Sequence, residues 1–217
     1  MAEVMMRAAD PALALAQQLR EINAALALHE VAPERLAQAV ELGARLRELL
    51  DGPPRASWYQ HDPVSPMASS GARLSYGDMS PLRGLRNPLA PPMQIERGTR
   101  ADGTPCMIGR AVLSRAYEGP PHGVHGGFVA ALFDEILGSA IGLAPPPGVT
   151  ATLEVRYRHV TPLEQELRFE AWVAQDRGRR IVAQATCSAG ETQTASAKGL
   201  FVRVDFDAVR RRMIGEE

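Results

Sequence analysis

The chain has 217 residues, enough to bury a substantial core in one domain of ordinary size or in one domain with a sizeable extension. Its 24 basic and 25 acidic residues give a formal net charge of -1, which excludes a general electrostatic attraction to nucleic acid or anionic lipid. The two cysteines have no CxxC spacing and no clustered histidines, so the sequence favours neither a disulfide framework nor a metal site.

No signal for secretion or membrane insertion is visible in the sequence. The first thirty residues lack a basic start followed by an uninterrupted apolar stretch. No segment approaches the roughly 20 apolar residues that a membrane-spanning helix needs. We therefore expect a soluble, cytoplasmic protein without a membrane span, a cofactor or a metal.

Residues 1–51 are expected to form an N-terminal helical extension. Apolar residues recur at helical spacing in two stretches, and Pro33 opens the second of them. These apolar residues are Leu15, Leu19, Ile22, Leu26, Leu36, Val40, Leu46 and Leu50. Residues 52–90 are rich in proline, glycine and serine, which indicates an irregular connector that contains the domain boundary.

Residues 91–207 have the pattern of an α+β domain. Two short strands, 93–98 and 106–116, precede an apolar helix over residues 126–143. Alternating apolar and polar residues then predict four strands in an antiparallel meander, with turns at residues 176–178 and 190–191. We expect a curved antiparallel sheet wrapped around one long central helix. We expect residues 208–217 to be a basic C-terminal tail.

The predicted helix contains an acid, Asp134, among apolar residues that fall on every face. A buried carboxylate costs several kcal/mol unless it is paired, hydrogen-bonded or protonated. One explanation is that Asp134 and Glu135 lie on a single solvated stripe. The other is that Asp134 has a chemical role.

The triplet His125-Gly126-Gly127 stands at the start of the same helix. Free backbone N–H groups and the positive end of the helix dipole favour a polarised carbonyl or an oxyanion there. The glycines let a substrate approach the backbone closely. A simple Gly-Gly turn is the alternative interpretation of the triplet.

Residues 119–163 resemble the PaaI-type, or HGG, branch of the hotdog-fold acyl-CoA thioesterases. The resemblance rests on HGGFVAALFDEILGSA (residues 125–140) and VTATLEVRYRHVTPL (residues 149–163). It implies that Asp134 is the general base or nucleophile and that the Gly126 N–H polarises the thioester carbonyl. It also implies that Thr150 positions the attacking water.

The chain departs from that family at three places. Gly119 stands where many members have an asparagine, so that polar helper is missing or is replaced by His122. Glu164 and Gln165 stand near a turn where the family often has glycine. The first 90 residues have a counterpart only in N-terminally extended members.

The helix rise of about 1.5 Å per residue puts the backbones of Gly126 and Asp134 roughly 12 Å apart. One thioester cannot easily touch both, whereas an antiparallel helix from a second copy would bring the two together. We therefore expect a homodimer or a dimer of dimers with active sites at the subunit interface, as the resemblance also implies.

Other residues are candidates for binding the acyl-CoA substrate. His125 orients the turn or contacts the thioester oxygen, with a purely structural role as an equal alternative, and Gly127 follows in the same turn. Glu135 is the second-choice carboxylate. Arg156 and Arg158 are candidates for the CoA phosphates because arginine binds phosphate well, although solvated strand arginines are an equal alternative.

Two other functions remain open from the sequence. A hotdog enoyl-CoA hydratase or dehydratase needs a histidine paired with a carboxylate, and residues 126–143 contain no histidine. An acyl-CoA-binding hotdog regulator would use the N-terminal helices to bind DNA. Residues 1–51 carry more acidic than basic side chains, which is a poor surface for phosphates.

Overall fold

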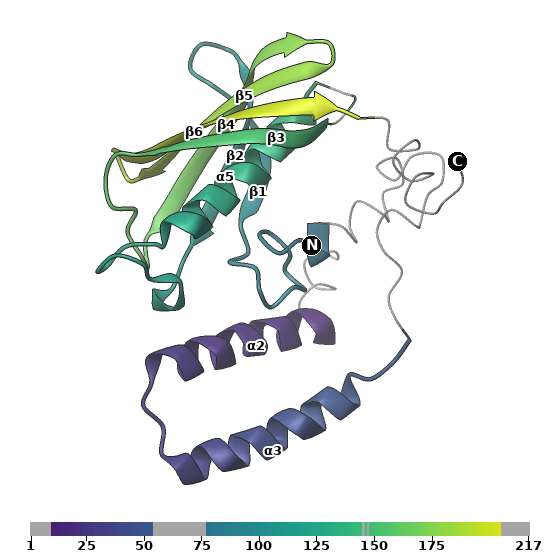
Figure 1. Cartoon of the computed structure of the whole chain (residues 1–217), viewed down its shortest axis with the longest axis vertical. Coiled ribbons are helices and arrows are strands. Elements are labelled where there is room, and N and C mark those ends of the chain that lie inside the picture. The colour runs from purple at the N-terminus through teal and green to yellow at the C-terminus, as the bar shows by residue number, and fades with distance from the viewer. Residues whose placement is uncertain (1–9, 54–76, 145, 147, 205–217) are drawn as a thin grey trace. The chain divides into compact units, whose positions relative to one another are not determined.

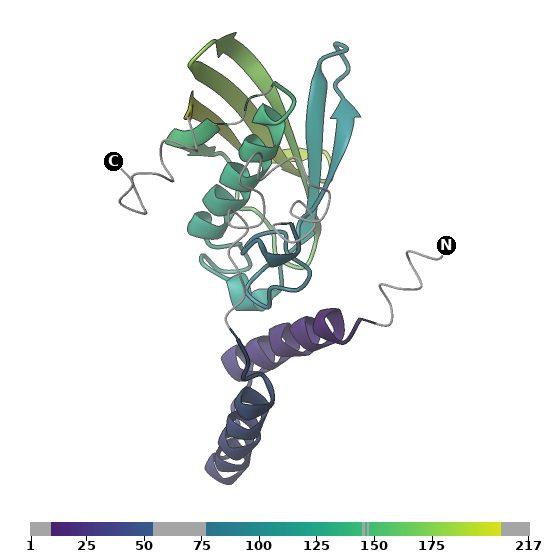
Figure 2. The ribbon, with the colours of Figure 1, turned by 90° about the vertical axis from the view of Figure 1, so that its right-hand side faces the viewer.

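The computed structural model describes residues 10–53, 77–144, 146 and 148–204. The chain divides into two compact units, Met1–Ala90 and Pro91–Glu217. The predicted basic tail and most of the predicted connector lie outside the described residues. The two units are drawn in Figure 1 and, turned by 90°, in Figure 2.

The first unit contains the two predicted helices, α2 (Pro11–Leu28) and α3 (Pro33–Leu49). The Asp10 side chain caps α2 by accepting a hydrogen bond of 2.9 Å from Ala12 N–H. Residues 80–90 consist mainly of turns, and Arg20 on α2 donates to their backbone, at 3.0 Å to the carbonyl of Asn87. The described part of the connector is therefore held against α2.

The second unit is a six-stranded antiparallel sheet that curves around one long helix, α5 (Gly126–Ile141). The strand order is β1-β2-β4-β5-β6-β3. The strand bounds are Gln94–Thr99, Pro105–Val112, Gly148–Tyr157, Glu166–Arg177, Arg180–Ala189 and Thr192–Arg203 for β1 to β6. This confirms the hotdog architecture predicted from the sequence.

One part of the predicted topology was wrong. The meander holds for β4, β5 and β6, but β3 pairs with β6 and β4 pairs with β2. The segment after β3 does not form a hairpin, because its backbone is bonded elsewhere: Thr161 accepts from Val124 N–H, and Glu164 donates to the carbonyl of Leu113. As a result β3 lies at the edge of the sheet.

The core lies between α5 and the facing side of the sheet. Phe133 on α5 meets Phe169 on β4 edge to face, with ring centroids 5.3 Å apart. Gly109 on β2 lets the helix approach, because a Cβ there would lie 3.1 Å from the Ile136 side chain. Seven residues of α5 are buried against the sheet, namely Val129, Leu132, Phe133, Ile136, Leu137, Ala140 and Ile141.

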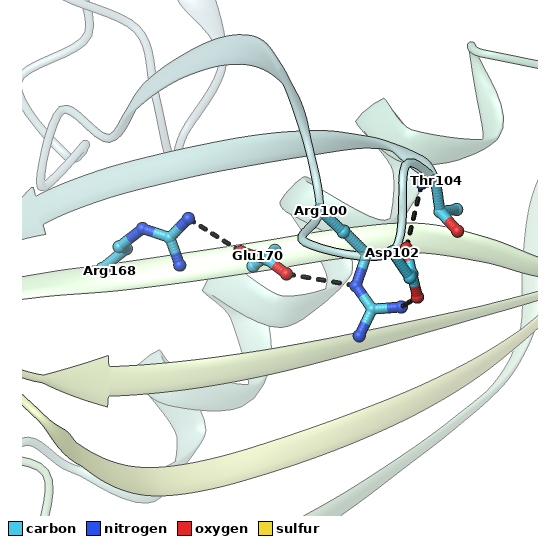
Figure 3. Close-up of polar contacts among 5 residues, drawn as sticks. All are labelled: Arg100, Asp102, Thr104, Arg168 and Glu170. Carbon is cyan, nitrogen blue, oxygen red and sulfur yellow. Dashed lines mark hydrogen bonds and ion pairs between the residues drawn. The ribbon is translucent and has the colours of Figure 1, made fainter.

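The opposite face of the sheet is polar (Figure 3). Glu170 on β4 lies between two arginines: it accepts from Arg100 at 3.1 Å and from Arg168 at 2.7 Å. The Arg100 guanidinium also lies 3.8 Å from the ring centroid of Trp172. This face therefore has its own charge pairs and is separated from α5 by the sheet.

Arg203, at the end of β6, holds the segment that connects α5 to β3. Its guanidinium pairs with both carboxylate oxygens of Asp176, at 2.7 and 2.8 Å. It also donates to the carbonyls of Ala144 and Pro146, at 2.9 and 3.0 Å. The hydrogen bond from Arg203 is the main reason that the pKa of Asp176 lies below its ordinary value.

This pairing predicts a defined acid dependence of stability. A carboxylate with a lowered pKa stabilises the fold fully above the unfolded-state value of about 3.9, and this contribution disappears as the pH falls through the lower folded-state value. Asp176→Asn should lower the melting temperature by a constant amount at neutral pH, and the difference from wild type should shrink below about pH 4. Thermal melts across pH test this, with Glu191→Gln at the next turn as the control. A difference that does not change with pH would contradict it.

Candidate active site

The start of α5 leaves one backbone donor unused. His125 is the N-cap, and its Nδ1 accepts a hydrogen bond of 3.0 Å from Gly127 N–H. The next N–H, that of Phe128, donates to the carbonyl of His125 at 2.9 Å. Gly126 N–H has no acceptor among the residues that the structure describes. This N–H is therefore available to a bound carbonyl or oxyanion.

The loop before α5 packs closely against His125 at Gly119. A Cβ at Gly119 would lie 2.6 Å from the His125 Cα, too close for any side chain in this conformation. Gly119 thus lies beside the histidine, and the polar side chain of many HGG members could not be accommodated there. His122 is exposed, has a positive φ of 60° and donates its N–H to the Glu118 carboxylate at 2.8 Å.

In the middle of α5, Asp134 meets Thr150 at the start of β3. The Thr150 hydroxyl donates to Asp134 Oδ1 at 2.8 Å. These two residues are 16 positions apart in the sequence. The structure therefore brings together two of the predicted site residues within one chain.

A β-bulge in β3 is what turns Thr150 towards the helix. Thr150 is opposite Phe201 and Thr152 is opposite Leu200, so one extra residue is accommodated between them. Directly opposed residues point to the same face of a sheet. Because Phe201 is buried in the core, Thr150 shares its face, and without the bulge it would point to the polar side.

Asp134 is half-buried in this chain; the sequence had left open whether it is buried among apolar residues or lies on a solvated stripe of the helix. It lies on a stripe of α5 whose other members are small and are exposed or half-exposed. These are Gly127, Ala130, Ala131 and Gly138. Glu135 is also half-buried, about 100° further around the helix.

The two predicted arginines do not lie with Asp134. Arg156 is opposite Ser196, on the polar face of the sheet, and it pairs with Glu154 at 2.9 Å. Arg158 follows the end of β3 and is exposed. Within one chain, Arg156 is therefore separated from Asp134 by the sheet.

Comparison with known proteins shows what the domain resembles. Residues 122–196 match the model of the thioesterase superfamily. A crystal structure described as that of a thioesterase superfamily protein is 26% identical, with a TM-score of 0.71, over 90% of this chain and 92% of that chain. Residues 122–196 are thus similar to the thioesterase superfamily in sequence, and the hotdog domain has the fold of a protein of that superfamily.

Other solved structures show more distant similarity to this chain. A Streptococcus mutans UA159 protein bound to acetyl CoA is 16% identical over 51% of this chain and 86% of its own, with a TM-score of 0.46. A Bacillus halodurans protein with CoA is 25% identical over 51% and 74%, with a TM-score of 0.43. No curated protein matches the chain.

The two cysteines of the hotdog domain are poor nucleophiles. Burial raises the pKa of Cys187 to about 11, and burial is also the main cause that raises the pKa of Cys106. Both thiols are buried and unpaired.

Among the described residues, no group of three or more His, Cys, Asp and Glu side chains is placed to hold a metal ion. No described helix is long and apolar enough to cross a membrane.

Sequence reasoning missed two features of this domain. The Tyr157 hydroxyl donates to the carbonyl of Gly126 at 2.8 Å, a contact between residues 31 positions apart. Glu164 has a positive φ of 58°, a conformation that glycine adopts at little cost. The glycine that the family often has near this turn was the only indication that a positive φ is needed here.

Proposed function

We propose that the chain is an acyl-CoA thioesterase that hydrolyses a thioester to a free acid and CoA. The observation that carries the proposal is the hydrogen bond of 2.8 Å between Thr150 and Asp134. It supplies an oriented carboxylate on the same helix whose start offers the unused N–H of Gly126. The match of residues 122–196 to the thioesterase superfamily model supports the reaction class.

The hydrogen bonding favours a water molecule held between Asp134 and Thr150. Thr150 uses its one hydroxyl proton on Asp134 Oδ1, so its oxygen can still accept a proton donor. A water molecule can donate one hydrogen to Thr150 and the other to Asp134 Oδ2. As Asp134 removes a proton from this water, the hydroxide attacks the thioester carbon.

The second half of the reaction uses the start of the helix. Gly126 N–H donates to the carbonyl oxygen as negative charge develops on it. Collapse of the tetrahedral intermediate breaks the C–S bond, and the proton held by Asp134 passes to the CoA sulfur. Direct attack by Asp134 on the thioester carbon, which would form an acyl anhydride that water then hydrolyses, is the other route open to the same residues.

A homodimer, alone or as part of a dimer of dimers, would combine the two halves of the site. Gly126 and Asp134 are separated by roughly 12 Å along α5. The exposed stripe of small residues on α5 permits close approach of another helix. The neighbouring β3 is an edge strand whose outer backbone groups can pair with a second copy. Each site would then take Asp134 and Thr150 from one chain and Gly126 from the other.

The substrate would be contacted by residues around the start of α5. Gly127, His122 and His125 surround the start of α5 and would contact the acyl-CoA there. Arg156 and Arg158 would bind CoA phosphates only if the nucleotide reaches the edge or the polar face of the sheet. A cytoplasmic location is consistent with two cysteines that are buried and unpaired.

Release of CoA thiol tests the function directly. We expect the purified chain to hydrolyse at least one member of a panel of acyl-CoAs that differ in chain length and aromaticity. Calorimetric binding of the same compounds runs in parallel. Tight binding without thiol release would favour the acyl-CoA-binding regulator, and neither binding nor release would remove acyl-CoA as the substrate class.

A further inference from the structure

Tyr157, the last residue of β3, covers the start of α5. Its hydroxyl donates to the carbonyl of Gly126 at 2.8 Å. Its ring lies against the same residue, since a Cβ at Gly126 would be 3.4 Å from the tyrosine Cζ. On the other end of the Gly126–Gly127 peptide, Gly127 N–H donates to His125 Nδ1 at 3.0 Å. This peptide group is therefore held at both its oxygen and its nitrogen.

Such a restraint has a physical purpose at this position. Two consecutive glycines have more backbone freedom than any other pair, and the first turn of a helix has the fewest internal hydrogen bonds. A backbone donor stabilises an oxyanion only if its direction is fixed before the charge develops. The hydrogen bond from Gly127 N–H to His125 does not connect this peptide to the sheet. The bond from Tyr157 to the Gly126 carbonyl does.

We propose that Tyr157 is a positioning residue for the Gly126 N–H, an inference that rests on the proposed thioesterase function. That N–H belongs to the adjoining His125–Gly126 peptide, and Tyr157 acts on it by holding the Gly126 carbonyl and by packing its ring against Gly126, which restricts rotation about the Gly126 Cα. It acts through Gly126 and does not touch the reacting atoms. The side chain is more than half exposed, at 53%, so it contributes little to the core. The same strand therefore orients Asp134 through Thr150 and Gly126 through Tyr157.

Tyr157→Phe removes the hydroxyl and keeps the ring over Gly126. We expect kcat for the best acyl-CoA to fall about 3- to 10-fold, the effect of one neutral hydrogen bond, with KM little changed. Thr152→Val removes a hydroxyl from the polar face of the same strand and is the matched control; it should leave kcat unchanged. Circular dichroism should show both variants folded.

Glycine-labelled NMR spectra provide a readout that is independent of activity. In Tyr157→Phe, the amide signals of Gly126 and Gly127 should shift, while they stay in place in Thr152→Val. Spectra of Gly126→Ala and Gly127→Ala assign the two signals. Unchanged amide signals, or an unchanged kcat in an active enzyme, would overturn the inference.

Two further outcomes are distinguishable. A rise in KM at constant kcat would show that Tyr157 contacts the substrate, which also overturns a role through Gly126. Shifted amide signals in a wild-type chain that releases no thiol would refute the proposed function and the catalytic part of this inference together. The thiol-release assay of the wild type therefore separates failure of the function from failure of the inference.

Discussion

Asp134→Asn should lower kcat for the best acyl-CoA by on the order of 10² to 10⁴, the span typical of general acid–base groups. The asparagine has nearly the same shape, and its side-chain oxygen can still accept the hydrogen bond that Thr150 donates to Asp134 Oδ1 at 2.8 Å. What it cannot do is take a proton from water or attack a thioester carbon. Binding should change little, so the loss should appear in kcat more than in KM.

The neighbouring carboxylate provides the matched control for this experiment. Glu135→Gln removes a charge from the same helix, and that side chain points about 100° away from Asp134. We expect near wild-type turnover from it. Loss only in Glu135→Gln would transfer the base to that residue, and full activity in both variants would remove the main support for the thioesterase proposal. Steady-state thiol release by both purified variants decides this.

Much of the fold could be predicted because it follows from periodicity along the chain. Alternation at period two placed the strands that follow α5, and the turn glycines Gly178 and Gly190 do have positive φ values, of 65° and 56°. The order of the strands in the sheet could not be predicted in this way, because strand pairing depends on where the connecting segments are bonded in the fold. The bonds of Thr161 and Glu164 to other segments decide that β3 lies beside β6, and no local pattern records them.

The candidate site shows the same division. Asp134 and the HGG triplet stand out because an acid and paired glycines are unusual within an apolar helix. Thr150 faces Asp134 because of a β-bulge in β3. Strict alternation along the strand would instead have put Thr150 on the opposite face of the sheet. The sequence left the exposure of Asp134 open, because apolar composition alone does not distinguish a core face from a face of small residues such as Gly138.

Gly126→Pro should remove the proposed oxyanion donor and little else. Gly126 is the first residue of α5. Proline is favoured at this position because the backbone N–H that it lacks would have no acceptor within the helix. His125 has φ −57° and ψ 129°, which is compatible with a following proline. We expect kcat to fall by on the order of 10² to 10³, the loss typical of one oxyanion-hole donor.

Gly126→Ala is the control, because it retains the N–H and adds a Cβ at an ordinary contact distance of 3.4 Å from Tyr157. Its turnover should lie far closer to wild type than that of the proline variant. Equal losses in both variants would mean that crowding at Gly126, and not the missing N–H, causes the defect. Melting temperatures of the two proteins check that each is folded.

Mixing the two inactive chains then tests whether the site is shared between subunits. If Asp134 of one chain works with Gly126 of the other, a heterodimer of Asp134→Asn and Gly126→Pro has one intact site and one doubly defective site. Random reassortment makes about half of the dimers mixed, so refolding the variants together should restore about a quarter of wild-type activity. A site built within one chain predicts no recovery, since every chain in the mixture carries one of the two defects. Co-purification with two different affinity tags shows whether heterodimers have formed and makes the absence of recovery interpretable.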